Sequence, residues 1–262
     1  GNGVAWNGIR WVAVGEGTNT IAYSSDGINW TGVIDSNNIF SVGYGVAWNG
    51  TRWIAFGRGT QSTNITIAYS SDGITWTGVT GSNTILSEGR GVAWNGTLWV
   101  AVGQGTNTIA YSSDGINWNG VTDSNNMFSF GYGVAWNGTL WVAVGSGTFS
   151  IAYSSDGITW TGVTDSTSIF SYGRGVAWNG TRFVAVGSGT FSIAYSSDGI
   201  NWTGVTDSNT IFLDSYGYAN SYGVAWNGTR FVAVGQGTTT NTIAYSSDGI
   251  NWTGVTGSTS IF

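Results

Sequence analysis

The chain has 262 residues, of which 7 are arginine and none lysine, and 13 are aspartate or glutamate, so its formal net charge is −6. This acidic balance argues against nucleic acid as a partner, because affinity for phosphates depends largely on Lys and Arg. Cysteine is absent, which excludes a disulfide framework and thiolate chemistry. The longest apolar runs are too short to span a bilayer, so we expect no membrane partner. Charged residues make up only 8% of the chain, and a surface rich in Asn, Ser and Thr suits neutral polar ligands.

Six copies of the segment Gly-Val-Ala-Trp-Asn-Gly divide the chain into repeats. The copies are spaced by 42, 46, 42, 42 and 48 residues and begin at Gly3, Gly45, Gly91, Gly133, Gly175 and Gly223. A period near 42, with four short β-patterned segments per unit, is typical of a β-propeller blade. The sequence therefore predicts an all-β, six-bladed β-propeller with four antiparallel strands per blade, a single domain over residues 1–262 and a monomer. The predicted blades are residues 1–44, 45–90, 91–132, 133–174, 175–222 and 223–262.

The fourth repeat illustrates the elements expected in every blade. Its four strands, named A to D in chain order, are predicted at Gly133–Trp136, Thr139–Val144, Ile151–Ser155 and Ile158–Val163. Asn-Gly joins strands A and B and Asp-Gly joins strands C and D, and both dipeptides favour tight hairpin turns. Residues 164–174 cross to the next blade. The 16 tryptophans recur at the end of strand A and early in strands B and D, a placement that indicates core packing.

The turn between strands C and D carries a second repeated motif. The segment Ser24–Trp30, Ser-Ser-Asp-Gly-Ile-Asn-Trp, recurs with small changes in every repeat, and its aspartates are Asp26, Asp72, Asp114, Asp156, Asp198 and Asp248. The motif resembles the Asp-box hairpin of sialidase-type (BNR-like) repeat propellers, although it is one residue shorter between Asp and Trp. We expect these aspartates to be structural, because Ser and Asp oxygens can accept bonds from turn N–H groups. One carboxylate per turn is too few for Ca²⁺, and we expect no metal and no other cofactor.

The same resemblance raises an alternative function, a sialidase-class glycoside hydrolase. Such enzymes bring three arginines to a substrate carboxylate, and use a tyrosine with a carboxylate partner and an aspartate acid/base. This chain has no His, Cys or Lys, and its only glutamates are Glu16 and Glu88, so most of the usual bases and nucleophiles are missing. The crossover aspartates, which we interpret as turn formers, are Asp35, Asp123, Asp165, Asp207 and Asp214. The chain is therefore predicted not to be an enzyme.

Differences among the repeats gather on one face. The A–B and C–D turns share one face of a four-strand meander and hardly vary, whereas the B–C loops and the D–A crossovers share the opposite face and do vary. At the last crossover position and in one B–C loop slot, the varying residues form a predicted ligand-binding set: Tyr44, Arg90, Tyr132, Arg174, Tyr222, Arg58, Gln104 and Gln236. Tyr, Arg and Gln suit stacking and hydrogen bonding. The alternative is that the loop sequences have diverged without a binding role, because packing does not restrain them.

The near-identity of the repeats indicates recent amplification of one blade or consensus design. In this respect the chain resembles both amplified giant-virus propellers and designed repeat propellers, and neither resemblance implies an activity. The leading functional hypothesis is a non-enzymatic binding or scaffold propeller, lectin-like in the broad sense, with a glycan or a protein as partner at the B–C/D–A face. The alternatives are the hydrolase and an amplified or engineered propeller without a selected ligand.

Overall fold

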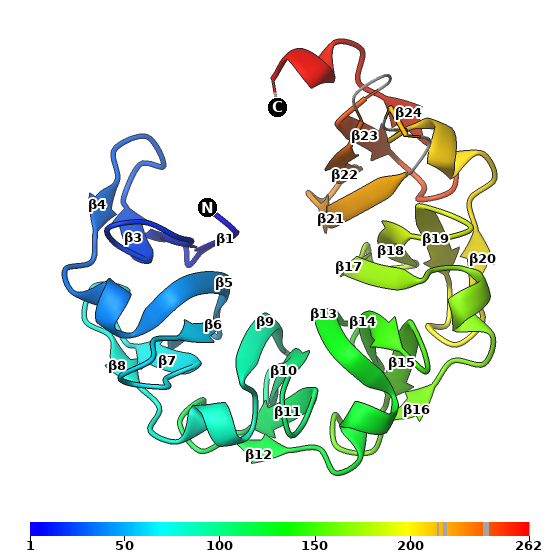
Figure 1. The fold of residues 1–262 in the computed structure, drawn as a ribbon. Coiled ribbons are helices and arrows are strands. Elements are labelled where there is room, and N and C mark those ends of the chain that lie inside the picture. Colours follow the sequence, from blue (N-terminus) through cyan, green and yellow to red (C-terminus); the bar gives the residue numbers. More distant parts are fainter. Residues whose placement is uncertain (214, 217–218, 238–240, 262) are drawn as a thin grey trace. The chain divides into compact units, whose positions relative to one another are not determined.

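The computed structural model describes residues 1–213, 215–216, 219–237 and 241–261. These residues form 24 strands and six short 3₁₀ helices (Figure 1). The strands follow one another as antiparallel groups of four, which we call blades 1 to 6, at the predicted repeat of about 42 residues. The predicted all-β class and four-strand repeat are therefore confirmed. Contacts divide the chain into two compact units, Gly1–Asn125 and Asn126–Phe262, which are described separately.

Unit 1 holds the first three blades. Blade 1 consists of β1 (Gly3–Trp6), β2 (Trp11–Val14), β3 (Ile21–Ser24) and β4 (Thr31–Gly32), followed by the 3₁₀ helix η1 (Ser36–Asn38). Blade 2 consists of β5 (Phe40–Trp48), β6 (Trp53–Gly59), β7 (Ile67–Ser70) and β8 (Thr77–Gly78), followed by η2 (Ser82–Thr84). Blade 3 consists of β9 (Glu88–Trp94), β10 (Trp99–Gln104), β11 (Ile109–Ser112) and β12 (Asn119–Gly120), followed by η3 (Ser124–Asn126). A backbone pair between Arg58 and Glu88 joins β6 to β9, so blades 2 and 3 form one eight-stranded sheet.

Unit 2 holds three separate four-stranded sheets. Blade 4 consists of β13 (Phe128–Trp136), β14 (Trp141–Gly147), β15 (Ile151–Ser154) and β16 (Thr161–Gly162), followed by η4 (Ser166–Ser168). Blade 5 consists of β17 (Tyr172–Trp178), β18 (Phe183–Ser188), β19 (Ile193–Ser196) and β20 (Thr203–Gly204), followed by η5 (Ser208–Thr210). Blade 6 consists of β21 (Asn220–Trp226), β22 (Phe231–Gln236), β23 (Ile243–Ser246) and β24 (Thr253–Gly254), followed by η6 (Ser258–Ser260). No helix in the described part of the chain is long and apolar enough to cross a membrane.

In blade 4 all four strands differ from the predicted bounds, and the first and fourth strands differ most. The fourth strand has only two residues in each described blade, because the residues before it form the Asp turn. In blades 2 to 6 the first strand is longer than predicted, and in blade 4 it starts at Phe128 because the extended end of β14 continues to pair with it. The predicted blade boundaries at residues 45, 91, 133, 175 and 223 therefore fall inside β5, β9, β13, β17 and β21.

The hydrophobic core lies between successive blades of a unit. Val142 and Val144 of β14, for example, pack in one buried cluster with Phe183 and Ala185 of β18. In the middle blade of each unit the second strand, β6 or β18, is apolar and buried on both faces because a blade of the same unit covers each side. Tryptophans differ in burial: those of the second strand in blades 2 to 4, Trp53, Trp99 and Trp141, are fully buried. Those of the first strand are partly buried in blades 2 to 6, and Trp6 in blade 1 is exposed.

A buried serine fixes each crossover to the third strand of its own blade. In blade 3, the Oγ of Ser124 accepts hydrogen bonds from the N–H groups of Thr108 (3.0 Å) and Ile109 (3.3 Å). Its carbonyl accepts a bond from Thr108 Oγ1 (2.8 Å). Equivalent bonds to the serine Oγ occur at Ser36, Ser82, Ser166, Ser208 and Ser258.

The residue before this serine adopts the left-handed backbone conformation. It is Asp35, Asp123, Asp165 or Asp207 in four blades, with φ between 59° and 61°, and Gly81 or Gly257 in the other two. Aspartate and glycine tolerate this region better than most residues, so the prediction that these four aspartates form turns is confirmed. The predicted crossover residues Asp214, Gly217 and Tyr218, and the loop residues 238–240, lie outside the described residues.

Candidate functional site

The first strand of blades 2 to 6 has a β-bulge at the last predicted crossover position, where the repeats carry either Tyr or Arg. In β5 the pairing with β6 shifts between Gly43 and Gly45, and in β17 the pairing with β18 shifts between Gly173 and Gly175. The residues inside these shifts, Tyr44 and Arg174, therefore have no direct partner in the ladder. Equivalent shifts occur at Arg90, Tyr132 and Tyr222. Because a bulge bends the strand and redirects a side chain, it presents these residues apart from the packed faces of the sheet.

Glycines beside the bulges let first strands of neighbouring blades approach closely. A Cβ atom placed on Gly45 of β5 would lie 2.5 Å from the carbonyl oxygen of Arg90 in β9. A Cβ on Gly175 of β17 would lie 3.3 Å from the Cα of Gly223 in β21. Contacts under 3.4 Å leave little room for any side chain. This backbone approach brings bulge residues of adjacent blades within reach of one another.

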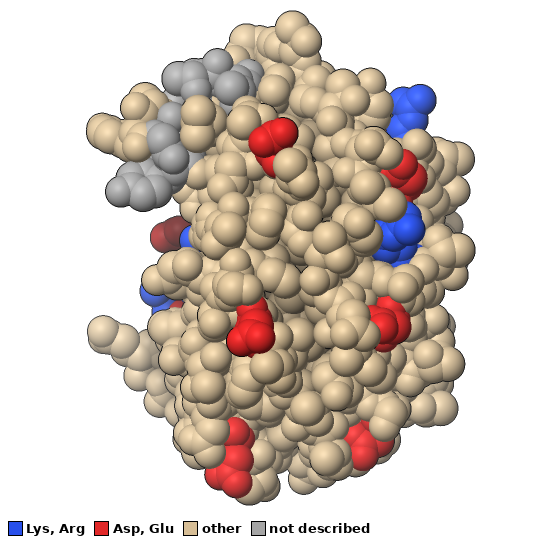
Figure 2. Space-filling view, turned by 90° about the vertical axis from the view of Figure 1, so that its right-hand side faces the viewer, with Lys and Arg blue, Asp and Glu red and all other residues tan. Residues whose placement is uncertain are grey.

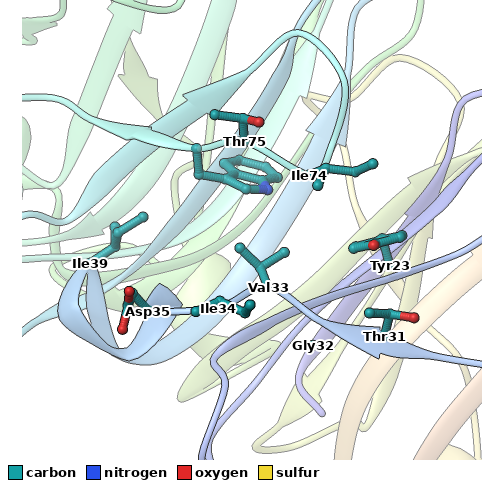
Figure 3. Close-up of a pocket in the computed structure, with 10 residues that line it drawn as sticks. Tyr23, Thr31, Gly32, Val33, Ile34, Asp35, Ile39, Ile74 and Thr75 are labelled. Atoms are coloured by element: carbon teal, nitrogen blue, oxygen red, sulfur yellow. The ribbon is translucent and has the colours of Figure 1, made fainter.

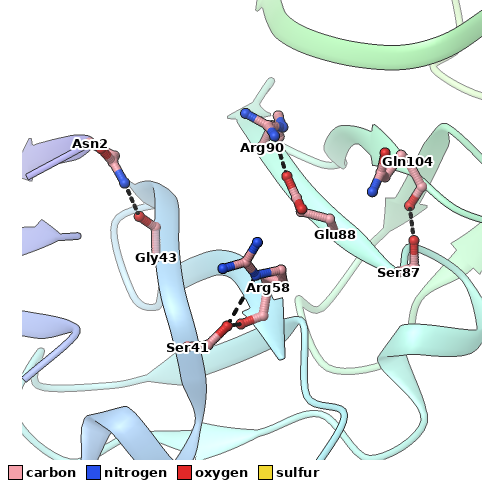
Figure 4. Close-up of polar contacts among 8 residues, drawn as sticks. All are labelled: Asn2, Ser41, Gly43, Arg58, Ser87, Glu88, Arg90 and Gln104. Atoms are coloured by element: carbon pink, nitrogen blue, oxygen red, sulfur yellow. Dashed lines mark hydrogen bonds and ion pairs between the residues drawn. The ribbon is translucent and has the colours of Figure 1, made fainter. Parts of the chain in front are cut away.

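In unit 1 the bulges unite Tyr44, Glu88 and Arg90. The guanidinium carbon of Arg90 lies 4.4 Å from the ring centroid of Tyr44, a cation–π distance. Arg90 also forms an ion pair with the carboxylate of Glu88, two residues earlier in β9 (Figure 4). Burial raises the pKa of the Tyr44 hydroxyl, and the negative charge of Glu88 raises it further. Tyr44 is therefore neutral at physiological pH and acts as a platform and hydrogen-bonding group.

Arg58 and Gln104, which were predicted in B–C loops, lie instead at the ends of β6 and β10 because these strands continue to pair with β5 and β9. Arg58 Nε donates to Ser41 Oγ (3.2 Å), and that hydroxyl donates to the carbonyl oxygens of Arg58 and Gly59 (both 3.1 Å). Ser87 Oγ donates to the carbonyl oxygen of Gln104 (3.2 Å). Figure 4 shows these contacts between β5, β6, β9 and β10. The structure thus brings Arg58 and Gln104 of the predicted set to the same strand ends as Tyr44 and Arg90.

In unit 2 the bulges surround one arginine with tyrosines. The guanidinium carbon of Arg174 lies 5.2 Å from the ring centroid of Tyr222, 5.6 Å from that of Tyr132 and 5.7 Å from that of Tyr172. Tyr222 also donates its hydroxyl to Gln236 Oε1 at 2.7 Å, so the last residue of β22 orients this ring. Tyr172 and Tyr222 remain 45% and 47% exposed. Arg174, Tyr132, Tyr222 and Gln236 of the predicted set therefore lie in one cluster, together with Tyr172.

Glu88 and Tyr172 take part in these clusters but were absent from the predicted ligand-binding set. Each lies two residues before an arginine of that set, on the same strand. Since residues i and i+2 point to the same side of a strand, this spacing could have identified both, had strand A been extended into the crossover.

The Asp turns hold their carboxylates in local hydrogen bonds. In blade 3, Asp114 Oδ1 accepts from the N–H groups of Ile116 and Asn117 (both 2.8 Å) and from Ser112 Oγ (3.0 Å). Partial burial opposes ionisation, but these bonds outweigh it and lower the pKa of Asp114 to about 2. For Asp26, the Asn29 side chain and the turn N–H groups lower the pKa. The same bonds recur around Asp72, Asp156, Asp198 and Asp248. These carboxylates are thus already bound within the turn.

Several of these turns also receive an arginine from the preceding blade. Arg52 of blade 2 donates to the carbonyl oxygen of Asp114 in blade 3, and Arg10 and Arg182 donate in the same way to Asp72 and Asp248. The bonds therefore tie neighbouring blades together.

In the view of Figure 2 the acidic side chains stand apart from one another on a mostly uncharged surface. Among the described residues, no group of three or more His, Cys, Asp or Glu side chains could hold a metal ion.

Two pockets differ in chemistry and position. A pocket of about 500 Å³ at the outer strands of blades 1 and 2 is lined by Val33, Ile34, Ile39, Ile74 and the Trp76 ring, with Tyr23 and Thr31 at one end (Figure 3). A pocket of about 550 Å³ beside the arginine cluster of unit 2 is lined by Tyr172 and by uncharged polar groups, namely Ser171, Ser188, Asn209 and Asn220. The second pocket adjoins the varying face, because its residues come from crossovers and a B–C loop.

No family model matches the chain, and no curated protein matches its sequence. Solved structures do match over most of its length. Two structures of virginiamycin B lyase from Staphylococcus aureus have TM-scores of 0.69 and 0.70 at 11% identity, covering 97% and 98% of this chain and 84% and 85% of the lyase. YCF48 from Cyanidioschyzon merolae has a TM-score of 0.64 at 15% identity, covering 98% of this chain and 85% of YCF48. A chain of a nidogen/laminin complex has a TM-score of 0.61 at 12% identity, covering 90% of this chain and 88% of the other.

The fold is that of a β-propeller. The neighbours are propeller proteins with different roles and low identity to this chain, so the likeness identifies the architecture alone.

Proposed function

We propose that this propeller is a non-enzymatic binding module that takes its ligand at the face formed by the B–C loops and the bulged ends of the first strands. The observation that carries the proposal is the grouping of Arg174 with Tyr132, Tyr172 and Tyr222 in unit 2. Tyr and Arg are enriched at binding surfaces and among the residues that dominate binding energy. Two of these rings are nearly half exposed, and therefore available to a ligand.

The proposed ligand is a glycan or a protein, and the module is lectin-like in the broad sense that it binds without transforming its ligand. Tyrosine rings beside hydroxyl and amide groups suit both partners. A similar structure comes from a nidogen/laminin complex, a precedent for a propeller in a protein assembly. The repeated Asp turn resembles an Asp-box, and in this proposal it stabilises the blades and has no part in binding.

The carboxylates of the chain support a role without catalysis. A general acid at neutral pH needs a raised pKa, whereas the pKa of each Asp-turn carboxylate is lowered. Glu88 is paired with Arg90, so a carboxylate of the protein already occupies the position that a substrate carboxylate would take at this arginine. Virginiamycin B lyase, on a similar scaffold, has a catalytically inactive variant in which a histidine is replaced by alanine, and this chain has no histidine.

A glycan array and a pull-down with the purified protein would test the proposal. A variant with Tyr44, Tyr132 and Tyr222 changed to alanine is expected to lose the ligands that the unmodified protein retains. The matched control changes Thr97, Thr139 and Thr181 to alanine in the exposed A–B turns at the other end of the blades, and should retain them. Binding that survives the tyrosine variant would place the site elsewhere. Hydrolysis of a fluorogenic sialoside that disappears in Arg174→Ala would overturn the non-enzymatic assignment.

A further inference from the structure

The two bulge arginines occupy the same repeat position but have different surroundings. Arg90 in blade 3 is paired with the carboxylate of Glu88, and their side chains are 30% and 7% exposed. In blade 5, the position two residues before the arginine is Tyr172, which is 45% exposed. Among the described residues, no carboxylate forms an ion pair with Arg174. Blade 5 therefore keeps the cation and lacks the carboxylate that blade 3 supplies.

The tyrosine rings around Arg174 attract its guanidinium group but carry no negative charge to neutralise it. Aromatic rings attract a guanidinium through their faces, whereas its N–H groups form a planar fork that matches a carboxylate. Three ring centroids lie 5.2 to 5.7 Å from the guanidinium carbon. Tyr222 is itself oriented by Gln236. The arginine is thus positioned by the rings and by its bulge while its hydrogen-bonding capacity remains for an acceptor.

The adjoining pocket offers a second, independent contact. Tyr172 lines the pocket of about 550 Å³ together with Ser188, Asn209 and Asn220. Asn209 Nδ2 donates to the carbonyl oxygen of Thr190 at 2.9 Å, which sets the orientation of the amide. Its Oδ1 is buried and has no donor among the described residues. A buried acceptor without a donor is costly, and a ligand with an N–H group would satisfy it.

We infer that Arg174, with Tyr172 and Tyr222, binds a carboxylate side chain of an acidic peptide segment, whose backbone enters the pocket at Asn209. This inference rests on the proposed binding function of the face and adds its ligand class. The carboxylate matches the group that Glu88 supplies to Arg90, and a peptide N–H matches the unsatisfied oxygen of Asn209. The net charge of −6 repels polyanions, so the ligand is a segment with a single carboxylate at this position.

The test uses the purified full chain and two short peptides, acetyl-Gly-Glu-Gly-amide and its glutamine counterpart. Titration is followed through the side-chain ¹⁵N–¹H signal of Arg174 Nε, and dissociation constants are measured by calorimetry. The glutamate peptide is expected to shift this signal, and the glutamine peptide to bind roughly tenfold more weakly or worse, since hydrogen bonds to charged groups exceed neutral ones by about that factor. Arg174→Gln should weaken the glutamate peptide by a similar factor.

Two further variants separate a specific role from a general loss of structure. Tyr172→Glu places in blade 5 the carboxylate that blade 3 carries, and should prevent peptide binding while the protein stays folded. Arg230→Leu removes a cation elsewhere, at a slot where blades 3 and 4 already carry Leu98 and Leu140, and should leave the affinity within about twofold, as expected for a distant surface change.

The outcomes distinguish this inference from the proposed function. Equal binding of both peptides, or unchanged binding in Tyr172→Glu, would overturn the carboxylate site while the binding face stands. Glucuronate bound through Arg174 in place of the glutamate peptide would overturn the peptide assignment. Failure of both peptides together with a negative array and pull-down would remove the proposed function as well.

Discussion

Replacing Ser124 by alanine should destabilise the protein far more than its small size suggests. The side chain is fully buried. Its Oγ accepts from Thr108 N at 3.0 Å and Ile109 N at 3.3 Å, and donates to the carbonyl oxygen of Val121 at 2.8 Å. Alanine keeps the backbone and the bond from Thr108 Oγ1 to the Ser124 carbonyl, so the substitution removes only the contacts of the hydroxyl.

The expected cost follows from the bonds that are lost. A buried donor or acceptor left without a partner costs about 1–3 kcal/mol, and the shortest accepted bond, from Thr108, supplies most of the loss. We expect the free energy of unfolding to fall by about 2 kcal/mol, and the melting temperature by roughly 4–8 °C at 2–4 °C per kcal/mol for a chain of this size.

Urea unfolding, followed by tryptophan fluorescence and circular dichroism, measures this loss. The control is Asn126→Ala, an exposed change in the same 3₁₀ helix, which should cost less than about 0.5 kcal/mol. Equal effects of the two substitutions would refute the view that the crossover serine holds the third strand through buried hydrogen bonds.

Three other substitutions or conditions test the fold. Trp99→Ala should cost about 3–5 kcal/mol in urea unfolding because the ring is fully buried, whereas Trp94→Ala should cost less because its ring is only partly buried; the reverse order would contradict the core assignment. The pKa of Asp114 in the folded protein is about 2, below its ordinary 3.8. The ionised carboxylate therefore stabilises the fold above about pH 4, and this stabilisation is lost as the pH falls toward 2. A melting temperature that stays constant from pH 5 to 2 would contradict this. Arg52→Ala should lower the free energy of unfolding by about 1 kcal/mol, because it removes the bond to the Asp114 carbonyl and the stacking over Tyr69 at 5.4 Å. Urea unfolding should show a smaller loss for Arg52→Leu, because leucine occupies the equivalent position in the next blade. A larger loss for Arg52→Leu than for Arg52→Ala would contradict this packing.

The repeat architecture could be predicted from sequence because its determinants are local. The Asn-Gly and Asp-Gly turns and the apolar second strands recur within a few residues of one another, and each enforces its geometry without help from distant residues. The same holds for the Asp turn, in which the carboxylate of Asp114 bonds only to residues two or three positions away. Comparison of the copies also identified the variable slot that holds Tyr44, Arg90, Tyr132, Arg174 and Tyr222.

What the slot does was decided by the tertiary structure. Which tyrosines of other blades surround each arginine, Tyr44 at Arg90 or Tyr132 and Tyr222 at Arg174, depends on the bulge that redirects the side chain. It also depends on how closely the neighbouring first strand approaches. Strand register and blade spacing are set by packing between residues about 40 positions apart, and no local pattern encodes them. The buried oxygen of Ser124 was missed for the same reason, since its partners begin 16 residues earlier in the chain.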